Sequence, residues 1–269
     1  MAELNQPLDR VLLTLEDGFD GAVPAVRHPS RDAALLRKAA RRVAEEHSLH
    51  LAVDDDAAAN HGPYSRGVEL GEILKRRRMV RAYEPRPVAR ETLERIVGTI
   101  RRAPSAGFSQ GQRLIVVTQP ERRREIAGAV GEDFYVQQGF APWISGAGAL
   151  VVVCTREEDY HDRYRQPDKL QDGDEIEWPV PYWYADAGAA AMLILLAAID
   201  EGLAAGVFGI PAERMEAVRE LLQLPADLAI VEVITLGHPA EDAASDRLSS
   251  RGTRPRRPLD QLIRWETWT

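Results

Sequence analysis

The feature that most constrains this chain is a long apolar segment in its second half. The run 187–199 is bounded by Asp186 and Asp200. It is shorter than the roughly 20 apolar residues that span a bilayer, and it predicts a buried helix over residues 185–203. A helix that is apolar all round lies in a protein core or at a subunit interface. We therefore expect a globular fold built around this helix, without a membrane as partner.

Composition and charge exclude several classes of protein. The chain has 269 residues, of which 45% are hydrophobic and 28% charged, as in one large globular domain or one domain with an appendage. The net charge of -8 argues against a nucleic-acid partner, which would require a basic face. The first residues lack the pattern of a secretory signal, and the single cysteine, Cys154, cannot form an internal disulfide. We expect a cytoplasmic protein.

A change of pattern divides the chain near residue 66. Residues 1–66 contain a helical stretch at 32–47 and end in turn-forming residues at 60–63. They are expected to form an N-terminal helical extension of unknown role. Residues 67–269 are expected to form the main domain.

Helical and strand-like patterns alternate through the main domain. Spacing and breaker residues predict helices at 68–78, 90–102, 121–130, 185–203 and 212–222. Apolar runs predict strands at 113–117, 149–153 and 228–236. The charged and aromatic stretch 156–184 is a long insert of the kind that usually forms a functional lid. This alternation favours an α+β or α/β fold.

The clearest chemical signal is a group of arginines at the end of the first of these helices. The sequence RRRMVR at 76–81 can hold a phosphate dianion through charge-assisted bidentate hydrogen bonds. The turn APSAGFSQ at 103–110 has small residues that let backbone amides approach a flat ligand. A solvated basic helix end followed by an ordinary loop would explain the same residues. From these residues alone both interpretations stay open.

These residues and later motifs resemble the nitroreductase-like flavoprotein superfamily. RRMVRAYEPRPV resembles its opening motif, and APSAGFSQGQRLIVV is similar to its cofactor turn and the strand that follows. DAGAAAMLILLAAIDEGLAAGVFGIP resembles its long central helix, while ITLGHP and RPRRPLDQLI resemble its last strand and closing basic segment. The likeness covers about residues 68–269, with the motifs in the family's order. It implies an α+β fold with a central mixed β-sheet surrounded by helices, and a homodimer with two flavins at its interface.

The resemblance also implies positions for flavin mononucleotide (FMN). Residues that match the family's phosphate and ribityl site are Arg77, Arg78, Met79 and Arg81, with Arg256 closing over the phosphate. The turn that lines the flavin, often from the other subunit, corresponds to Pro104, Ser105, Ala106, Gly107 and Gln110. The segment near the ring edge corresponds to Gly206, Val207 and Phe208. No catalytic side chain is expected, because the flavin itself carries the redox chemistry.

Three positions depart from the family pattern. Met79 stands where the family usually has serine, which removes one side-chain hydrogen bond to the cofactor. Phe108 replaces the common asparagine, and Gly111 replaces the common proline. Phe108 also occurs in the flavin-fragmenting branch that makes the lower ligand of cobalamin.

The position of the insert at 156–184 helps to distinguish branches of the family. In the iodotyrosine-like branch a lid precedes the strand equivalent to 150–153. Here the corresponding stretch 132–144 is short and the insert follows the strand, which counts against a deiodinase. The expected substrate contacts in the insert are Arg163, Tyr164, Lys169 and Trp183. For each of them, packing against the dimer partner is the alternative.

Other residues that could suggest a functional site are interpreted as structural. The glycines at 146 and 148 precede a strand, so they are not a dinucleotide fingerprint. His47 and His50 lack further ligands, and no metal is expected. Cys154 is interpreted as a buried packing residue, and Trp265 and Trp268 as an anchor across the dimer.

These inferences predict an FMN-dependent oxidoreductase. NAD(P)H would reduce the flavin and leave, and a nitroaromatic, quinone or similar small-molecule acceptor would then be reduced at the same ring face, by a ping-pong mechanism. One alternative is an oxygen-dependent enzyme that fragments reduced flavin to dimethylbenzimidazole. Another is a non-enzymatic flavin-binding or sequestering protein.

Overall fold

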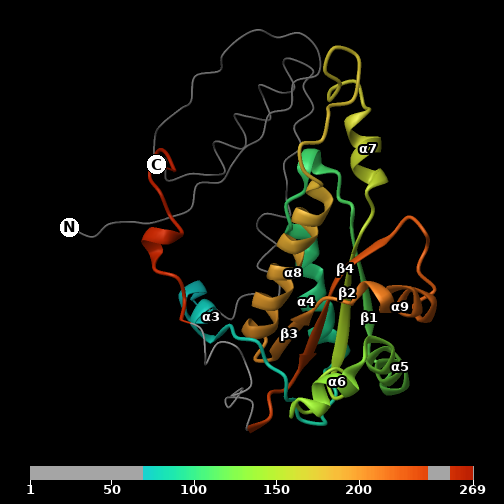
Figure 1. The fold of residues 1–269 in the computed structure, drawn as a ribbon, viewed down its shortest axis with the longest axis vertical. Coiled ribbons are helices and arrows are strands. Elements are labelled where there is room, and N and C mark those ends of the chain that lie inside the picture. The colour runs from blue at the N-terminus through green and yellow to red at the C-terminus, as the bar shows by residue number, and fades with distance from the viewer. Residues whose placement is uncertain (1–68, 242–254, 269) are drawn as a thin grey trace, which may run out of the picture. The chain divides into compact units, whose positions relative to one another are not determined.

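A four-stranded sheet forms the centre of the part of the chain that the computed structural model describes, residues 69–241 and 255–268 (Figure 1). Its strands are β1 (Gln112–Val117), β2 (Ala149–Thr155), β3 (Ala204–Phe208) and β4 (Ala229–Gly237), in the order β1-β2-β4-β3. The predicted α+β class is confirmed. The N-terminal extension, the boundary at residue 66, His47 and His50 lie outside the described residues.

The described sheet is antiparallel throughout, whereas the resemblance implied a mixed sheet. β2 pairs antiparallel with both β1 and β4, and β3 pairs antiparallel with β4. β2 and β3 run in the same direction and are joined through helices, which is the pattern of a parallel crossover. Because β4 lies between them, this parallel pair never forms hydrogen bonds.

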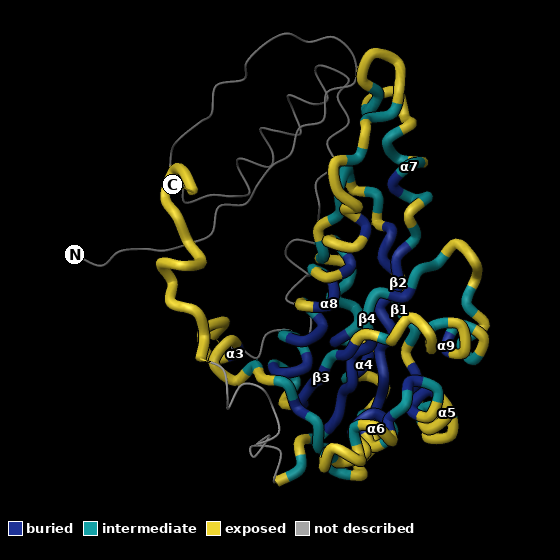
Figure 2. Tube along the Cα trace, in the orientation of Figure 1, coloured by how far each residue is buried: buried dark blue, intermediate teal, exposed yellow. Residues whose placement is uncertain are grey.

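Strand β2 is the centre of the core. All seven of its residues are buried. Alternate side chains point to opposite faces of a sheet, so Val151 and Val153 pack in one apolar cluster while Leu150 and Val152 pack in another. Helices α4 and α8 cover the first face, and α5 and α9 cover the second (Figures 1 and 2). Helical layers on both faces explain why this strand is a continuous apolar run.

Seven α-helices occur among the described residues. They are α3 (Leu70–Arg76), α4 (Arg90–Gly98), α5 (Pro120–Val130), α6 (Glu132–Gln137), α7 (Glu158–Tyr164), α8 (Tyr182–Asp200) and α9 (Met215–Leu221). Short 3-10 turns span Thr99–Arg102, Ala106–Phe108, Ala212–Arg214 and Leu259–Gln261. The predicted helices at 90–102 and 212–222 are therefore each part α-helix and part 3-10 turn.

Helix α8 is the predicted buried helix, but it begins at Tyr182, earlier than expected. With these bounds it is long and apolar enough to cross a bilayer by length and composition alone. In the fold it lies against the sheet, and Ala187, Ile194 and Ala198 have no exposed surface. The prediction of a buried core helix is confirmed.

The insert at 156–184 is more regular than the sequence predicted. It contains α7, in which Tyr160 is fully buried and faces the body of the protein. Tyr160 and Tyr164 are four residues apart and lie on one side of that helix. The charged residues around the two tyrosines hid the apolar periodicity that would have predicted this helix.

Candidate functional site

The arginine segment, residues 77–81, runs beside β3. It leaves α3 in an extended conformation, and the Val80 amide donates to the Ala205 carbonyl at 3.0 Å. The Tyr83 hydroxyl, whose pKa is raised by burial, donates to the Val80 carbonyl at 2.9 Å and also hydrogen-bonds Thr235. The segment is therefore held at Val80, through both the amide and the carbonyl of this residue.

Gly206 permits this close approach. A Cβ at this position would lie 2.7 Å from the Val80 carbonyl oxygen and 2.8 Å from the Thr235 hydroxyl. The structure thus brings the predicted phosphate residues together with the predicted ring-edge segment, which is strand β3 (Ala204–Phe208). The sequence did not predict that this segment is a strand.

Three arginines, Arg77, Arg78 and Arg81, give the arginine segment a high density of positive charge. Within the described residues, Arg77 and Arg78 form no hydrogen bond or ion pair with any side chain. The guanidinium of Arg81 lies over the rings of Phe140 and Trp143, at 5.4 and 5.5 Å from their centroids. The Trp143 indole nitrogen is buried and has no partner among the described residues. Arg78 also borders a cavity of about 230 Å³.

These features fit an anionic group that accepts hydrogen bonds. Guanidinium groups without carboxylate partners, such as those of Arg77 and Arg78 among the residues that the structure describes, are the donors that a phosphate requires. Met79, half-buried in the same segment, adds no such donor. Arg256 lies in the described segment 255–268, where every residue is exposed, and its closing over the phosphate stays a prediction.

The second group of predicted cofactor residues forms a strained turn, residues 103–111. The φ angles of Gly107, Phe108 and Gln110 are 59°, 61° and 53°, in the left-handed region. Ser105 stabilises the turn by accepting the Gln110 amide at 3.0 Å. Positive φ values at non-glycine residues cluster at functional sites and need support from outside.

We predict that Phe108→Asn stabilises the protein. Phe108 is 72% exposed, so its ring gains little from packing, while an aromatic residue in the left-handed region costs about 1–2 kcal/mol. Asparagine tolerates this conformation. The melting temperature should rise by about 2–4 °C. Phe134→Asn is the control, because Phe134 is also exposed but helical; a fall for Phe108→Asn would contradict the prediction.

The two groups of cofactor residues lie at opposite ends of α8. The Asp186 carboxylate, near the start of the helix, accepts the Ala106 amide of the turn at 2.8 Å. At the other end, the Ile199 carbonyl accepts a hydrogen bond from Arg76, which precedes the arginine segment. The rise of 1.5 Å per residue separates Asp186 from Ile199 by about 20 Å. A single chain therefore does not bring the turn to the arginine segment.

Three of the four predicted substrate contacts lie together at the turn. Arg163 donates from Nε to the Gly107 carbonyl at 2.9 Å. The ring of Tyr164 occupies the space where Gly107 lacks a side chain, and Lys169 lies 5.5 Å from the centre of that ring. Trp183 lies apart from them, in contact with the rings of Tyr160, His161 and Trp178.

Sequence reasoning missed two residues that hold the turn. Asp186 was only the boundary of an apolar run, yet its carboxylate receives both the Ala106 amide and the Tyr160 hydroxyl, at 2.8 and 2.9 Å. Burial and the hydrogen bond to Asp186 raise the pKa of Tyr160, so the hydroxyl stays protonated and donates. The sequence did contain one indication of this role, because Asp186 is a carboxylate in the first turns of an otherwise apolar helix.

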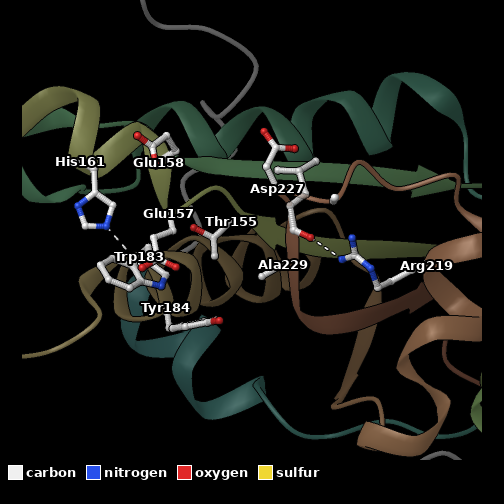
Figure 3. Close-up of a pocket in the computed structure, with 11 residues that line it drawn as sticks. Thr155, Glu157, Glu158, His161, Trp183, Tyr184, Arg219, Asp227 and Ala229 are labelled. Atoms are coloured by element: carbon white, nitrogen blue, oxygen red, sulfur yellow. Dashed lines mark hydrogen bonds and ion pairs between the residues drawn. The ribbon is translucent and has the colours of Figure 1, made fainter.

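A cavity of about 430 Å³ lies on another side of α7 (Figure 3). Its lining includes Glu157, His161, Trp183, Tyr184 and Asp227. His161 bonds Glu175 at 2.5 Å and approaches Glu157 at 3.5 Å. Sequence reasoning had not assigned this cavity.

We predict that His161 makes the stability of the insert depend on pH. Burial lowers its pKa, but the hydrogen bonds and charges of Glu175 and Glu157 outweigh burial and raise it above 6.5. The stabilisation is therefore complete below about pH 6.5 and lost as pH rises through the raised pKa. His161→Gln should lower the melting temperature by about 1–4 °C at pH 6 and by less at pH 9. Equal losses at both pH values would refute this; His238→Gln is the control.

Cys154 is fully buried, as predicted, and burial raises the pKa of its thiol to about 11. The thiol is therefore neutral at physiological pH and unsuited to nucleophilic chemistry. Within residues 69–241 and 255–268 no three histidine, cysteine or acidic side chains are grouped so that they could hold a metal ion.

The fold is an α+β sheet covered by helices, with a segment containing three arginines beside its edge strand β3. A model of the Nitroreductase family matches residues 74–238. The chain belongs to this family.

Individual relatives agree with this assignment. A "Putative NADH dehydrogenase/NAD(P)H nitroreductase" of Archaeoglobus fulgidus is 31% identical over 176 residues, covering 65% of this chain and 87% of the relative. An "FMN reductase [NAD(P)H]" of Bacillus subtilis is 27% identical, covering 74% and 75%. The structure of the NADPH:FMN oxidoreductase of Vibrio harveyi with NAD+ has the same fold, with a TM-score of 0.55, 23% identity and coverage of 74% and 78%.

Proposed function

We propose that this protein is an FMN-dependent oxidoreductase that passes reducing equivalents from NAD(P)H to a nitroaromatic, quinone or similar acceptor by a ping-pong mechanism. The names of its relatives support the coarser part of this proposal, an NAD(P)H-dependent oxidoreductase that uses flavin. The observation that carries it is the arginine segment, which runs beside β3 and in which Arg77 and Arg78 have no carboxylate partner within the part of the chain that the structure describes.

Each part of the chain has a separate task in this proposal. Arg77, Arg78 and Arg81 hold the phosphate of FMN, and the bound flavin supplies hydride acceptance and donation. The turn holds the flavin ring in place through its backbone. The insert at 156–184 excludes water and selects the acceptor. No side chain has to act as acid or base.

The proposed enzyme is a homodimer. In one chain the turn lies at the start of α8 and the arginine segment at its other end, so a complete cofactor site needs the turn of a second chain. Large apolar side chains are exposed on the described part of one chain, including Leu70 and Leu74 on α3 and Met192 on α8, and a second chain packed on them would bury them. Trp265 and Trp268 of the C-terminal segment are 83% and 69% exposed, as expected for the proposed anchor across the dimer. The separation of the half-sites supports a turn that serves the partner's flavin.

The test is a visible absorption spectrum of the purified protein before and after anaerobic addition of NADH or NADPH. A bound flavin spectrum that bleaches with either donor, and returns when a quinone is added, is the expected result. A bound flavin that neither donor bleaches would favour the sequestering protein. Loss of the flavin spectrum in air with dimethylbenzimidazole as product would favour flavin fragmentation. A protein that takes up no FMN would overturn the cofactor assignment.

A further inference from the structure

The cavity of about 430 Å³ beside α7 is bordered by none of the residues expected to hold FMN (Figure 3). It lies between the last residue of β2, the start of β4, and helices α7 and α8. Its volume falls in the range of about 300–1,000 Å³ that is usual for small-molecule sites. The cavity is therefore a candidate for a ligand other than FMN.

Two buried polar groups of the cavity lining have no hydrogen-bond partner among the described residues. They are the hydroxyl of Thr155, a residue without exposed surface, and the indole nitrogen of Trp183, a residue that is 8% exposed. Buried polar groups in native proteins are nearly always paired, and an unpaired one destabilises the fold. The indole nitrogen can only donate, so the missing partner carries an acceptor atom.

Strand pairing fixes the backbone that carries the Thr155 hydroxyl. Thr155 is the last residue of β2 and pairs with both β1 and β4. Directly before it, the pairing of β2 with β4 shifts in register between Val153 and Cys154. Bulges of this kind are common next to functional sites, where they re-aim a side chain. The hydroxyl is therefore held at the cavity from both sides of its strand.

Ring contacts fix the Trp183 indole. The centres of the Tyr160, His161 and Trp178 rings lie 6.0, 5.8 and 5.8 Å from that of the indole. Packed against three rings, the indole cannot swing outward to bring its nitrogen to bulk water. In the view of Figure 3 this nitrogen is on the side of the ring that faces Thr155. A ligand with an acceptor oxygen can therefore be bound from this side of the cavity.

The charges of the lining favour a cation. Three carboxylates border the cavity, and two of them are paired with arginines at 2.6 Å, Glu158 with Arg165 and Asp227 with Arg156. The third, Glu157, lies 3.5 Å from His161, which bonds Glu175 more closely, at 2.5 Å. Arg219 also borders the cavity, but both of its terminal nitrogens bond backbone carbonyls, at residues 225 and 228. Within the described lining, Glu157 is therefore the carboxylate with the weakest compensation.

We propose that this cavity binds a small amine that also carries a carbonyl group. The carbonyl oxygen accepts hydrogen bonds from the Thr155 hydroxyl and the Trp183 indole, and the ammonium group pairs with Glu157. Trp183 and Tyr184 supply aromatic surface for the rest of the molecule. The proposal goes beyond the proposed function, because the residues assigned to FMN lie elsewhere.

The test follows the indole N–H resonance of Trp183 by NMR in the 15N-labelled full chain. The chain has five tryptophans, and the resonance of Trp183 is the one that Trp183→Phe removes. The first probe is 3-(aminomethyl)benzamide, whose amine is protonated at neutral pH. The second is 3-methylbenzamide, which has the same ring and carbonyl group without the ammonium group.

The Trp183 resonance is expected to shift, with saturation, as 3-(aminomethyl)benzamide is added. The uncharged 3-methylbenzamide should bind about two- to fivefold more weakly, as for the loss of a partly exposed ion pair. Glu157→Gln should remove this preference for the cation. Glu94→Gln is the matched control, because its carboxylate lies on α4 and its side chain is 59% exposed, against 55% for Glu157.

Thr155→Val should weaken the binding of both probes by about two- to tenfold. The substitution exchanges an unpartnered buried hydroxyl for a methyl group, so the melting temperature of the variant should not fall below that of wild type. Thr155→Ser, which keeps the hydroxyl, should bind both probes as wild type does.

Three results would overturn the proposal. A Trp183 resonance that does not move with 3-(aminomethyl)benzamide would mean that the cavity does not take this class of ligand. Equal affinities of wild type for the two probes would show that the site does not select a cation. Unchanged affinity in a folded Thr155→Val variant would show that the hydroxyl is not part of the site. FMN occupancy does not enter these measurements, so they are decided separately from the proposed function.

Discussion

Replacing Arg77 and Arg81 together with alanine is expected to release the flavin. Each guanidinium that bonds a phosphate contributes about 1.5–3 kcal/mol. Losing two of them should raise the FMN dissociation constant by about 10²–10⁴-fold. The variant should purify colourless, and calorimetric titration with FMN should give the weakened affinity.

The control removes two arginines without touching the site. Arg90 and Arg124 form exposed helical ion pairs with Glu94 and Glu121, so Arg90→Ala with Arg124→Ala should keep the flavin. Because Arg81 also packs on Trp143, the melting temperature of the Arg77→Ala single variant should be compared with that of the double variant. A double variant that purifies fully loaded would show that the phosphate is bound elsewhere.

The substitution Gly206→Ala is expected to remove the arginine segment from β3. The new methyl group would overlap the Val80 carbonyl oxygen, which is backbone and cannot rotate away. The hydrogen bond between Val80 and Ala205 would be lost, at a cost of about 1–3 kcal/mol in the free energy of unfolding. The FMN dissociation constant should rise by at least about tenfold.

Gly128→Ala is the matched control for this change. Gly128 lies within α5 and has no atom within 4 Å of an added Cβ. Alanine favours helix over glycine by about 1 kcal/mol, so this variant should be as stable as wild type or more stable. Unchanged FMN affinity in Gly206→Ala would mean that the position of the arginine segment against β3 is not needed for binding.

Sequence patterns predicted the long elements well and the short ones poorly. The apolar runs that became β1, β2 and β4 have a clear pattern, although only β2 is buried throughout and the edge strand β1 is buried only at its two ends. Helix α8 is apolar along most of its length. Strand β3, with the sequence AAGVF, and the six-residue α6 are too short to show a period. They are ordered by their neighbours, β3 by pairing with β4 and α6 by the buried carboxylate of Glu132, which accepts the Ile144 amide at 2.6 Å.

The candidate site was predictable where it depends on residue type and less so where it depends on geometry. Basic residues at 77–81 and small residues at 103–110 were visible as a pattern. The role of Asp186 was not, because its partners Ala106 and Tyr160 are distant in sequence. The resemblance supplied the idea that two chains share one site, and the length of α8 supplied a physical reason for it.

The separation of the half-sites along α8 has a consequence for how the protein would behave on dilution. If each cofactor is held between two chains as proposed, occupancy follows mass action in the protein as well as in FMN. A dilute sample would lose colour even at saturating cofactor, and added apoprotein would restore it. The flavin content of a preparation would then report subunit association, and bound FMN would stabilise the dimer.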